Sequence, residues 1–236
     1  MLLSGLRKTD ADVIRMNFRR FASDASSMDE AGERIVRYLH QELRTESGSA
    51  LALVRFFKTH PFVQLPPELQ RFASNLMSGV ERPDWLRCLT LLATAGDLAN
   101  WQSRDGSRGH QAIPLASEQM VREAPMISQL IQQFGHSIAT VVNPPTDLAI
   151  EATKTSGVFY VADALGSPHI PAQEEFVRPY GVRSIVGFGG LLPSADLWAV
   201  IMFCKVSVSP EVAELFKRLA SSLTVSLIPL NARVFK

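Results

Sequence analysis

Four polar residues in the last third of the chain have the chemistry to bind an anion. Arg178, Tyr180 and Arg183 lie close together in the sequence, and Asp163 precedes them. Guanidinium groups pair well with carboxylates and phosphates, so the two arginines could hold an anionic ligand. The alternative is that Arg183 pairs with Asp163 or that the two residues bond to nearby backbone. We favour this local pairing over ligand binding.

The histidines do not form a metal-binding pattern. Neither an HExxH nor an HxH spacing occurs among them, which argues against a zinc site. His110 follows a polar, glycine-containing loop at 97–109, and His169 lies in Gly-Ser-Pro-His-Ile-Pro. A lone histidine is more often a surface or hydrogen-bonded structural residue than a ligand. Trp101, in the same loop, could close a pocket or lie on the surface.

Two further features, the cysteines and a glycine-rich run, contain residue types found in reactive or phosphate-binding sites, but their sequence surroundings do not fit such sites. Cys88 and Cys204 fall within apolar stretches, where a cysteine usually acts as a small hydrophobic residue. The run Gly187-Phe188-Gly189-Gly190 has strand-like residues on both sides, whereas a phosphate-binding loop leads into a helix. We therefore expect these glycines to allow close packing within a strand.

Composition excludes several classes of protein. The chain has 236 residues, 46% of them hydrophobic, and 24 basic residues against 23 acidic ones. That is enough for one large or two small domains with a substantial core. A net charge of +1 without a basic stripe argues against a nucleic-acid partner. The longest apolar run, Leu197–Cys204, is far too short to cross a bilayer, so no membrane insertion and a cytoplasmic location are expected.

The elements that must position these residues can be predicted from hydrophobic spacing. Residues 1–45 predict two helices, the second beginning after Ser27 with Glu30 three residues on, as in a capping box. The middle of the chain predicts strands at 50–58, 86–95 and 137–142, a helix at 68–78, and a helix at 117–134 that is interrupted near Pro125.

The last third shows the clearest pattern. A strand at 157–161 is followed by a loop, a short helix at 172–180 and Gly181. Two strands, 182–192 and 197–206, are joined by a short turn that suits an antiparallel hairpin. Ser209 and Pro210 begin a helix that runs to about Ile228. These elements predict an α+β fold, with helices packed on an antiparallel sheet and an added N-terminal helical segment.

The stretch from Phe159 (FYVADALGSPHIPAQEEFVRPYGVRSIVGFGGLL) through DLWAVIMFCKV and SPEVAELFKRLASSLTVSLIPL resembles the second half of a GAF domain. The shared features are an aspartate after a strand, a short helix, a glycine, a strand with an Arg-Ser pair, and a final amphipathic helix. The resemblance implies two parts: an N-terminal helical segment at 1–45, and a GAF-like sensory domain at 46–236 with an enlarged segment at 97–156. The whole chain resembles the sensory regions that precede histidine kinases or diguanylate cyclases in bacterial signalling proteins.

The resemblance also implies a function. It predicts a non-catalytic module that binds a small ligand or cofactor, of unknown identity, between the sheet and its covering loops. Occupancy would act through the terminal helices of a homodimer on a kinase or cyclase output module. Replacing Arg183 or His169 with alanine is predicted to weaken ligand uptake. The candidate ligand-binding residues are Trp101, His110, Asp163, His169, Arg178, Tyr180 and Arg183.

Two alternatives remain open. One is a degenerate GAF-like domain used only for dimerisation, through residues 10–44 and 210–228, or for docking a partner. Its cavity would be filled by Phe188, Trp198, Met202 and Phe203. The other is a thiol-dependent enzyme, because one GAF-like family reduces methionine sulfoxide with cysteines. That alternative requires Cys88 and Cys204 to be exposed and reactive.

Overall fold

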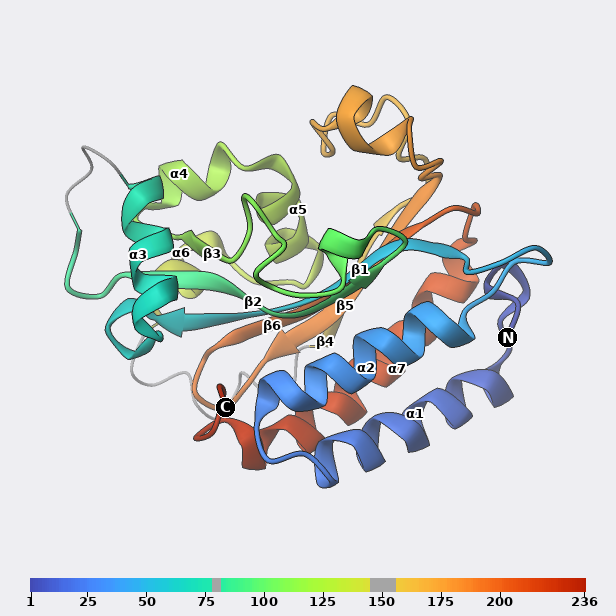
Figure 1. The fold of residues 1–236 in the computed structure, drawn as a ribbon, viewed down its shortest axis with the longest axis horizontal. Coiled ribbons are helices and arrows are strands. Elements are labelled where there is room, and N and C mark those ends of the chain that lie inside the picture. The colour runs from blue at the N-terminus through green and yellow to red at the C-terminus, as the bar shows by residue number, and fades with distance from the viewer. Residues whose placement is uncertain (78–81, 145–155) are drawn as a thin grey trace.

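A single antiparallel sheet organises the molecule. The computed structural model describes residues 1–77, 82–144 and 156–236. Its six strands lie in the order β3-β2-β1-β6-β5-β4, so that the N-terminal and C-terminal halves of the chain meet where β1 pairs with β6 (Figure 1). The strands are β1 (Leu51–Pro61), β2 (Arg87–Gly96), β3 (Ala112–Pro114), β4 (Ser156–Val161), β5 (Ser184–Leu191) and β6 (Leu197–Cys204).

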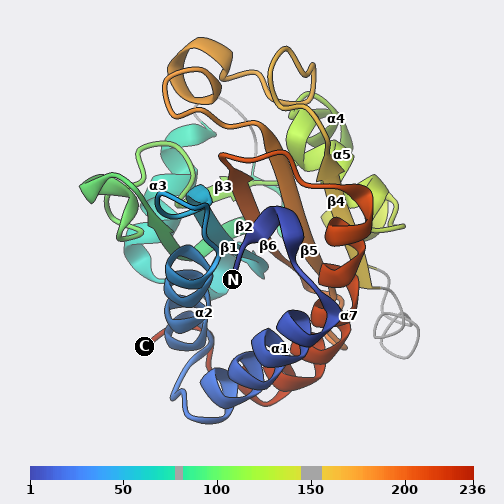
Figure 2. The ribbon, with the colours of Figure 1, turned by 90° about the vertical axis from the view of Figure 1, so that its right-hand side faces the viewer.

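Three helices cover one face of this sheet. They are α1 (Lys8–Ser23), α2 (Met28–Glu42) and α7 (Pro210–Leu227), which lie together below the sheet in Figure 1 and side by side in Figure 2. Their apolar stripes meet Phe56 of β1, Phe188 of β5 and Trp198 of β6 in one hydrophobic cluster. The two N-terminal helices therefore share a core with the sheet and with α7.

The opposite face carries shorter elements. These are α4 (Glu118–Arg122), α5 (Pro125–Gln133), α6 (Ile138–Val142), and the short helical turns η3 (Ala99–Trp101) and η6 (Gln173–Val177). A second hydrophobic cluster joins them to the sheet through residues such as Leu53, Phe159 and Phe203. A third, smaller cluster lies under α3 (Pro67–Leu76), next to the edge strand β3.

Side-chain caps fix where the main helices begin. The Ser27 hydroxyl accepts a bond from the Glu30 backbone N–H, and the Glu30 carboxylate accepts one from the N–H of Ser26. This is the predicted capping box with one difference: the Glu30 carboxylate accepts from the N–H of Ser26 instead of that of the N-cap residue Ser27. At α7, the Ser209 hydroxyl accepts from the Val212 N–H while Pro210 occupies the first turn.

The glycines of β5 and β4 permit close packing, as expected from the sequence. A Cβ atom at Gly189 would lie 2.1 Å from the carbonyl oxygen of Trp198 and 2.8 Å from the Phe134 ring. One at Gly157 would lie 2.4 Å from the Cα of Phe134. Because these glycines have no side chains, Phe134, the residue that follows α5 (Pro125–Gln133), can approach the sheet directly.

Two of the expected elements differ from the structure, and one strand was not expected. Residues 137–142 form helix α6 instead of a strand, because the Ser137 hydroxyl caps the Thr140 N–H and begins a helical turn. The edge strand β3 falls in a stretch that carried no strand pattern. The short helix expected at 172–180 is limited to the single turn η6.

Part of the enlarged segment predicted at 97–156 lies outside the described residues, as does the last residue of the helix predicted at 68–78. Within the described part of the chain, no helix is long and apolar enough to cross a membrane.

Candidate ligand-binding site

A cavity of about 530 Å³ lies on the face of the sheet that the three long helices leave free. Its floor consists of alternate residues of two central strands, because successive side chains of a strand point to opposite faces. β1 contributes Leu53, Arg55 and Phe57, and β6 contributes Ala199, Ile201 and Phe203. The cover is formed by α5, the loop around η3 and the start of η6.

An aromatic cluster forms one wall of this cavity. The Trp101 ring lies 5.6 Å from the Phe176 ring and 4.6 Å from the Tyr180 ring, both in edge-on arrangements. Phe176 in turn meets Phe203 at 4.9 Å and 90°. These contacts tie the η3 and η6 segments, which are far apart in sequence, to each other and to β6. Such rings give the wall a defined shape and a largely apolar surface.

Arg55 is the polar exception on the cavity floor. Its Nε atom is inaccessible to solvent and has no hydrogen-bond partner, and no ion pair to Arg55 exists among the described residues. Burial lowers the pKa of the guanidinium to about 10, so the group stays charged at neutral pH. A cation without a partner among the described residues therefore faces a largely apolar space.

His110 lies at the mouth of the cavity, where the residue as a whole remains exposed. Desolvation of the ring, and secondarily the charge of Arg55, lower its pKa to about 4. The imidazole is therefore neutral at pH 7 and can donate or accept a hydrogen bond without adding charge.

The structure places two of the seven predicted site residues, Trp101 and His110, in the lining of the cavity. Tyr180 stands behind that lining, where it supports Trp101 and Phe176.

The other four predicted residues lie outside the lining. Asp163 is exposed, and its carboxylate accepts a bond from the Leu165 N–H. Arg178 is exposed and pairs with Glu174 one helical turn away, at 2.8 Å. Arg183 is exposed, and no ion pair joins it to Asp163 in the described structure. His169 is half-buried, with its backbone N–H bonded to the Ser167 hydroxyl.

Sequence reasoning missed Arg55. It lies in the middle of the stretch ALALVRFFK, where every other residue but the last is apolar. A charged residue in a strand that is buried on both faces was the signal that could have identified it, because such charges are rarely buried without a partner.

Of the four residues expected to fill the cavity, one belongs to its lining. Phe203 lines it, but Phe188, Trp198 and Met202 belong to the cluster on the helix-covered face. The expectation was wrong for these three, because it did not separate the two faces of the hairpin strands.

The cysteines are both fully buried, and burial raises the pKa of each thiol to about 12. A thiol-dependent reaction would need an accessible thiolate, which neither position offers. Among the described residues, no group of three or more His, Cys, Asp or Glu side chains is arranged to hold a metal ion.

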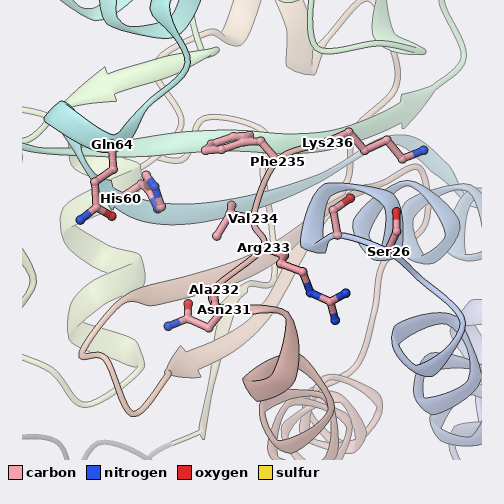
Figure 3. Close-up of a pocket in the computed structure, with 10 residues that line it drawn as sticks. Ser26, His60, Gln64, Asn231, Ala232, Arg233, Val234, Phe235 and Lys236 are labelled. Carbon is pink, nitrogen blue, oxygen red and sulfur yellow. The ribbon is translucent and has the colours of Figure 1, made fainter.

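A second hollow, of about 500 Å³, follows the C-terminal tail (Figure 3). His60 and Gln64, at the end of β1 and just after it, face residues 231–236, with Ser26 on the far side. The tail is held there by backbone bonds from the N–H groups of Met28 and Asp29 to the carbonyls of Arg233 and Val234. This hollow is therefore the seam along which the tail docks against the beginning of α2.

No family model matches the chain, and no curated protein matches it. Solved structures of phytochromes align with it. The phycoerythrobilin-bound GAF domain of a cyanobacterial phytochrome aligns over 97% of this chain and 98% of its own, at 10% identity and a TM-score of 0.45.

Two longer phytochrome structures align as well. A bacteriophytochrome from R. palustris shares 13% identity at a TM-score of 0.42, and the Stigmatella aurantiaca photosensory core module 15% at 0.39. The chain spans 39% and 37% of their lengths.

The fold assignment rests on the chain's own topology. The order β4, loop, η6, Gly181, β5, turn, β6 and α7 is the order on which the resemblance to GAF domains was based. Gly181 has the positive φ of 61° that a helix-ending glycine adopts. The observed order of elements therefore agrees with the resemblance to GAF domains. The predicted α+β class, an antiparallel sheet with helices packed on it, is confirmed.

Proposed function

We propose that this chain is a non-catalytic, cytoplasmic sensory module that binds a small molecule in the cavity over β1 and β6. The observation that carries the proposal is the cavity itself. It holds about 530 Å³ between a rigid sheet and three separate covering segments, within the size range of small-molecule sites. Its lining is mainly apolar with few polar groups, which is the usual composition of such sites.

A route from the cavity to the helices supports a sensory role. On β6, Ile201 lines the cavity, whereas its neighbours Val200 and Met202 pack against the helices. The same strand bonds to α7 where Trp198 Nε1 donates to the Thr224 hydroxyl at 3.2 Å. A ligand that shifts β6 would therefore also displace α7, because a single layer of side chains separates the two elements.

The proposed output is a histidine kinase or a diguanylate cyclase, reached through the terminal helices of a homodimer. Apolar side chains on the outer surfaces of these helices are consistent with a second copy. Met16 of α1 is 59% exposed and Val225 of α7 is 67% exposed. Light scattering of the chain, and of a Met16→Glu, Val225→Glu double variant, tests this part: a dimer that the double variant dissociates supports it, and a monomeric wild type contradicts it.

The first experiment is native mass spectrometry of the purified chain, followed by thermal denaturation with candidate ligands. A discrete mass excess would establish a bound molecule. The decisive variant is Ile201→Trp, which fills the cavity floor, with Val200→Ile on the opposite face of the same strand as its matched control. Binding that survives in Val200→Ile and disappears in Ile201→Trp supports the proposal. Equal mass excess or equal thermal shifts in both variants would place the ligand elsewhere.

A further inference from the structure

The cavity floor contains a positive charge that no described residue neutralises. Arg55 is held on β1 between Val54 and Phe56, whose side chains face the helices, so its own side chain faces the cavity. Its Nε is buried and lacks a partner in the described structure. Arg55 is only partly exposed, and holding a charge away from water without a partner destabilises a folded protein. Such a group is explained most simply by a partner that arrives with a ligand.

We propose that the cavity binds a small organic acid, whose carboxylate pairs with Arg55 and whose apolar body fills the space enclosed by α5, η3 and η6. This inference rests on the proposed function and names the class of ligand that the same site would take. The guanidinium presents parallel N–H donors that match the two oxygens of a carboxylate.

The charges around the cavity favour a single negative charge on the ligand. Arg55 is the one positively charged residue in the described lining. His110 is neutral at pH 7 and can add a hydrogen bond but no charge. Glu175 lies exposed at the rim, and no ion pair joins it to Arg55. A phosphate with two charges, or a nucleotide with a polar sugar, would bring more polar atoms than this lining can satisfy.

The rest of the lining fits an apolar body. Phe57, Phe176 and Phe203 supply aromatic surface, and Leu53, Leu130 and Ile201 supply aliphatic surface. Removing such surface from water on binding provides affinity, while the ion pair provides orientation and selectivity for the charged end.

The test compares acids with their neutral amides. Octanoate, hexanoate, phenylacetate and 3-phenylpropionate, each paired with its amide, are titrated into the full chain by calorimetry and by thermal denaturation at pH 7. We expect at least one acid to bind about tenfold or more tightly than its amide, because the amide leaves the guanidinium without a charged partner. The preference should weaken at high salt.

Substitutions of Arg55 separate this role from a structural one. Arg55→Gln and Arg55→Leu should abolish the preference for the acid. Because they remove a partly buried charge that has no partner among the described residues, they should leave the melting temperature of the free chain unchanged or raise it by a few degrees. Arg55→Lys should retain part of the preference. Arg71→Gln, at an exposed arginine of α3, is the matched control and should change neither property.

The possible results are distinct. Acid preference that depends on Arg55 supports the inference. Equal binding of acids and amides, or a preference that persists in Arg55→Gln, overturns the inference but leaves a ligand-binding module intact. A large loss of stability in both Arg55→Gln and Arg55→Leu would make the arginine structural and would also overturn it. If no acid or amide binds and the purified chain carries no ligand, the inference and the proposed function both fail.

Discussion

The ammonium group of Lys58 donates a 2.7 Å hydrogen bond to the carboxylate of Asp196, although 138 positions separate the two residues in the sequence. Both side chains are almost completely buried, with exposures of 1% and 8%. Arg87, at the start of β2, approaches the other carboxylate oxygen, and the Ser194 hydroxyl donates to the same carboxylate at 2.7 Å. One acidic residue thus holds β1, β2 and the turn before β6 together.

Asp196→Asn should therefore destabilise the chain strongly. The substitution leaves Lys58 and Arg87 without this carboxylate as their partner, and breaking a buried pair in this way typically costs about 3–5 kcal/mol. The free energy of unfolding, measured with urea, checks this value. A double variant with Lys58→Met should lose less than the sum of the two single changes, because the second substitution removes one of the stranded charges.

Asp97→Asn is the control for that prediction. Asp97 also accepts a bond from a lysine, Lys205 at 2.8 Å, but this pair lies near the surface. Its loss should cost less than about 1 kcal/mol. Similar losses at Asp97 and Asp196 would mean that the buried cluster contributes no more than a surface pair.

Gly189→Ala tests the close packing of β5 against the paired strand β6 and the Phe134 ring. A methyl group there would lie 2.1 Å from the Trp198 carbonyl oxygen, which belongs to the backbone of the paired strand and cannot easily move. We expect a loss of about 1–3 kcal/mol in urea unfolding, the usual cost of overpacking. At Gly48, where a Cβ would meet no atom within 4 Å, the same substitution should change stability little. Equal stabilities of the two variants would contradict the packing described here.

Most of the fold could be predicted from the sequence because its signals are local. Ser27, Ser209 and Pro210 mark helix starts whatever the rest of the chain does, and the apolar runs of β1, β2, β5 and β6 are long enough to identify. The segment 137–142 was misassigned because a short apolar run has no clear period, and the cap of Ser137 decided its structure. Whether the helical segment 1–45 forms a separate unit from 46–236 stays a prediction.

The candidate site was harder to predict because tertiary contacts assemble it. Trp101 and Tyr180 were singled out separately, but only folding brings their rings to 4.6 Å. Arg178 looked like a ligand-binding residue in the sequence, and a local helical contact with Glu174 uses its charge instead. Arg55 looked like one residue of an ordinary strand, because sequence alone does not show that no acidic residue of the described structure pairs with it.

The cysteines should be unreactive in the native chain. Only the thiolate reacts readily, and burial raises the pKa of both Cys88 and Cys204 to about 12. With a thiol-specific reagent at pH 8, neither should be modified in the folded protein, and both should react after unfolding in urea. Rapid modification of either thiol in the native chain would restore the alternative of a thiol-dependent enzyme.

His60 should make the fold sensitive to mild acid. Burial, followed by the charges of Lys58 and Arg87, lowers its pKa from 6.5 to about 4, while the ring packs edge-on against Phe235 at 5.4 Å. Between these values the unfolded chain binds a proton that the folded chain does not. The contribution of neutral His60 to the free energy of unfolding should therefore be fully present above about pH 6.5. It should be lost as the pH decreases towards 4, by up to about 3 kcal/mol.

The measurement is the free energy of unfolding at several pH values between 4 and 7, for the wild type and for His60→Gln. The variant has no group to protonate at this position, so its stability should fall less steeply over that range, even if it is less stable at pH 7. His169→Gln, at a half-buried histidine in the loop before η6, should keep the wild-type slope. If His60→Gln loses stability with acid as steeply as the wild type, His60 is protonated in the folded chain, and the packing of the tail over it must tolerate a charge.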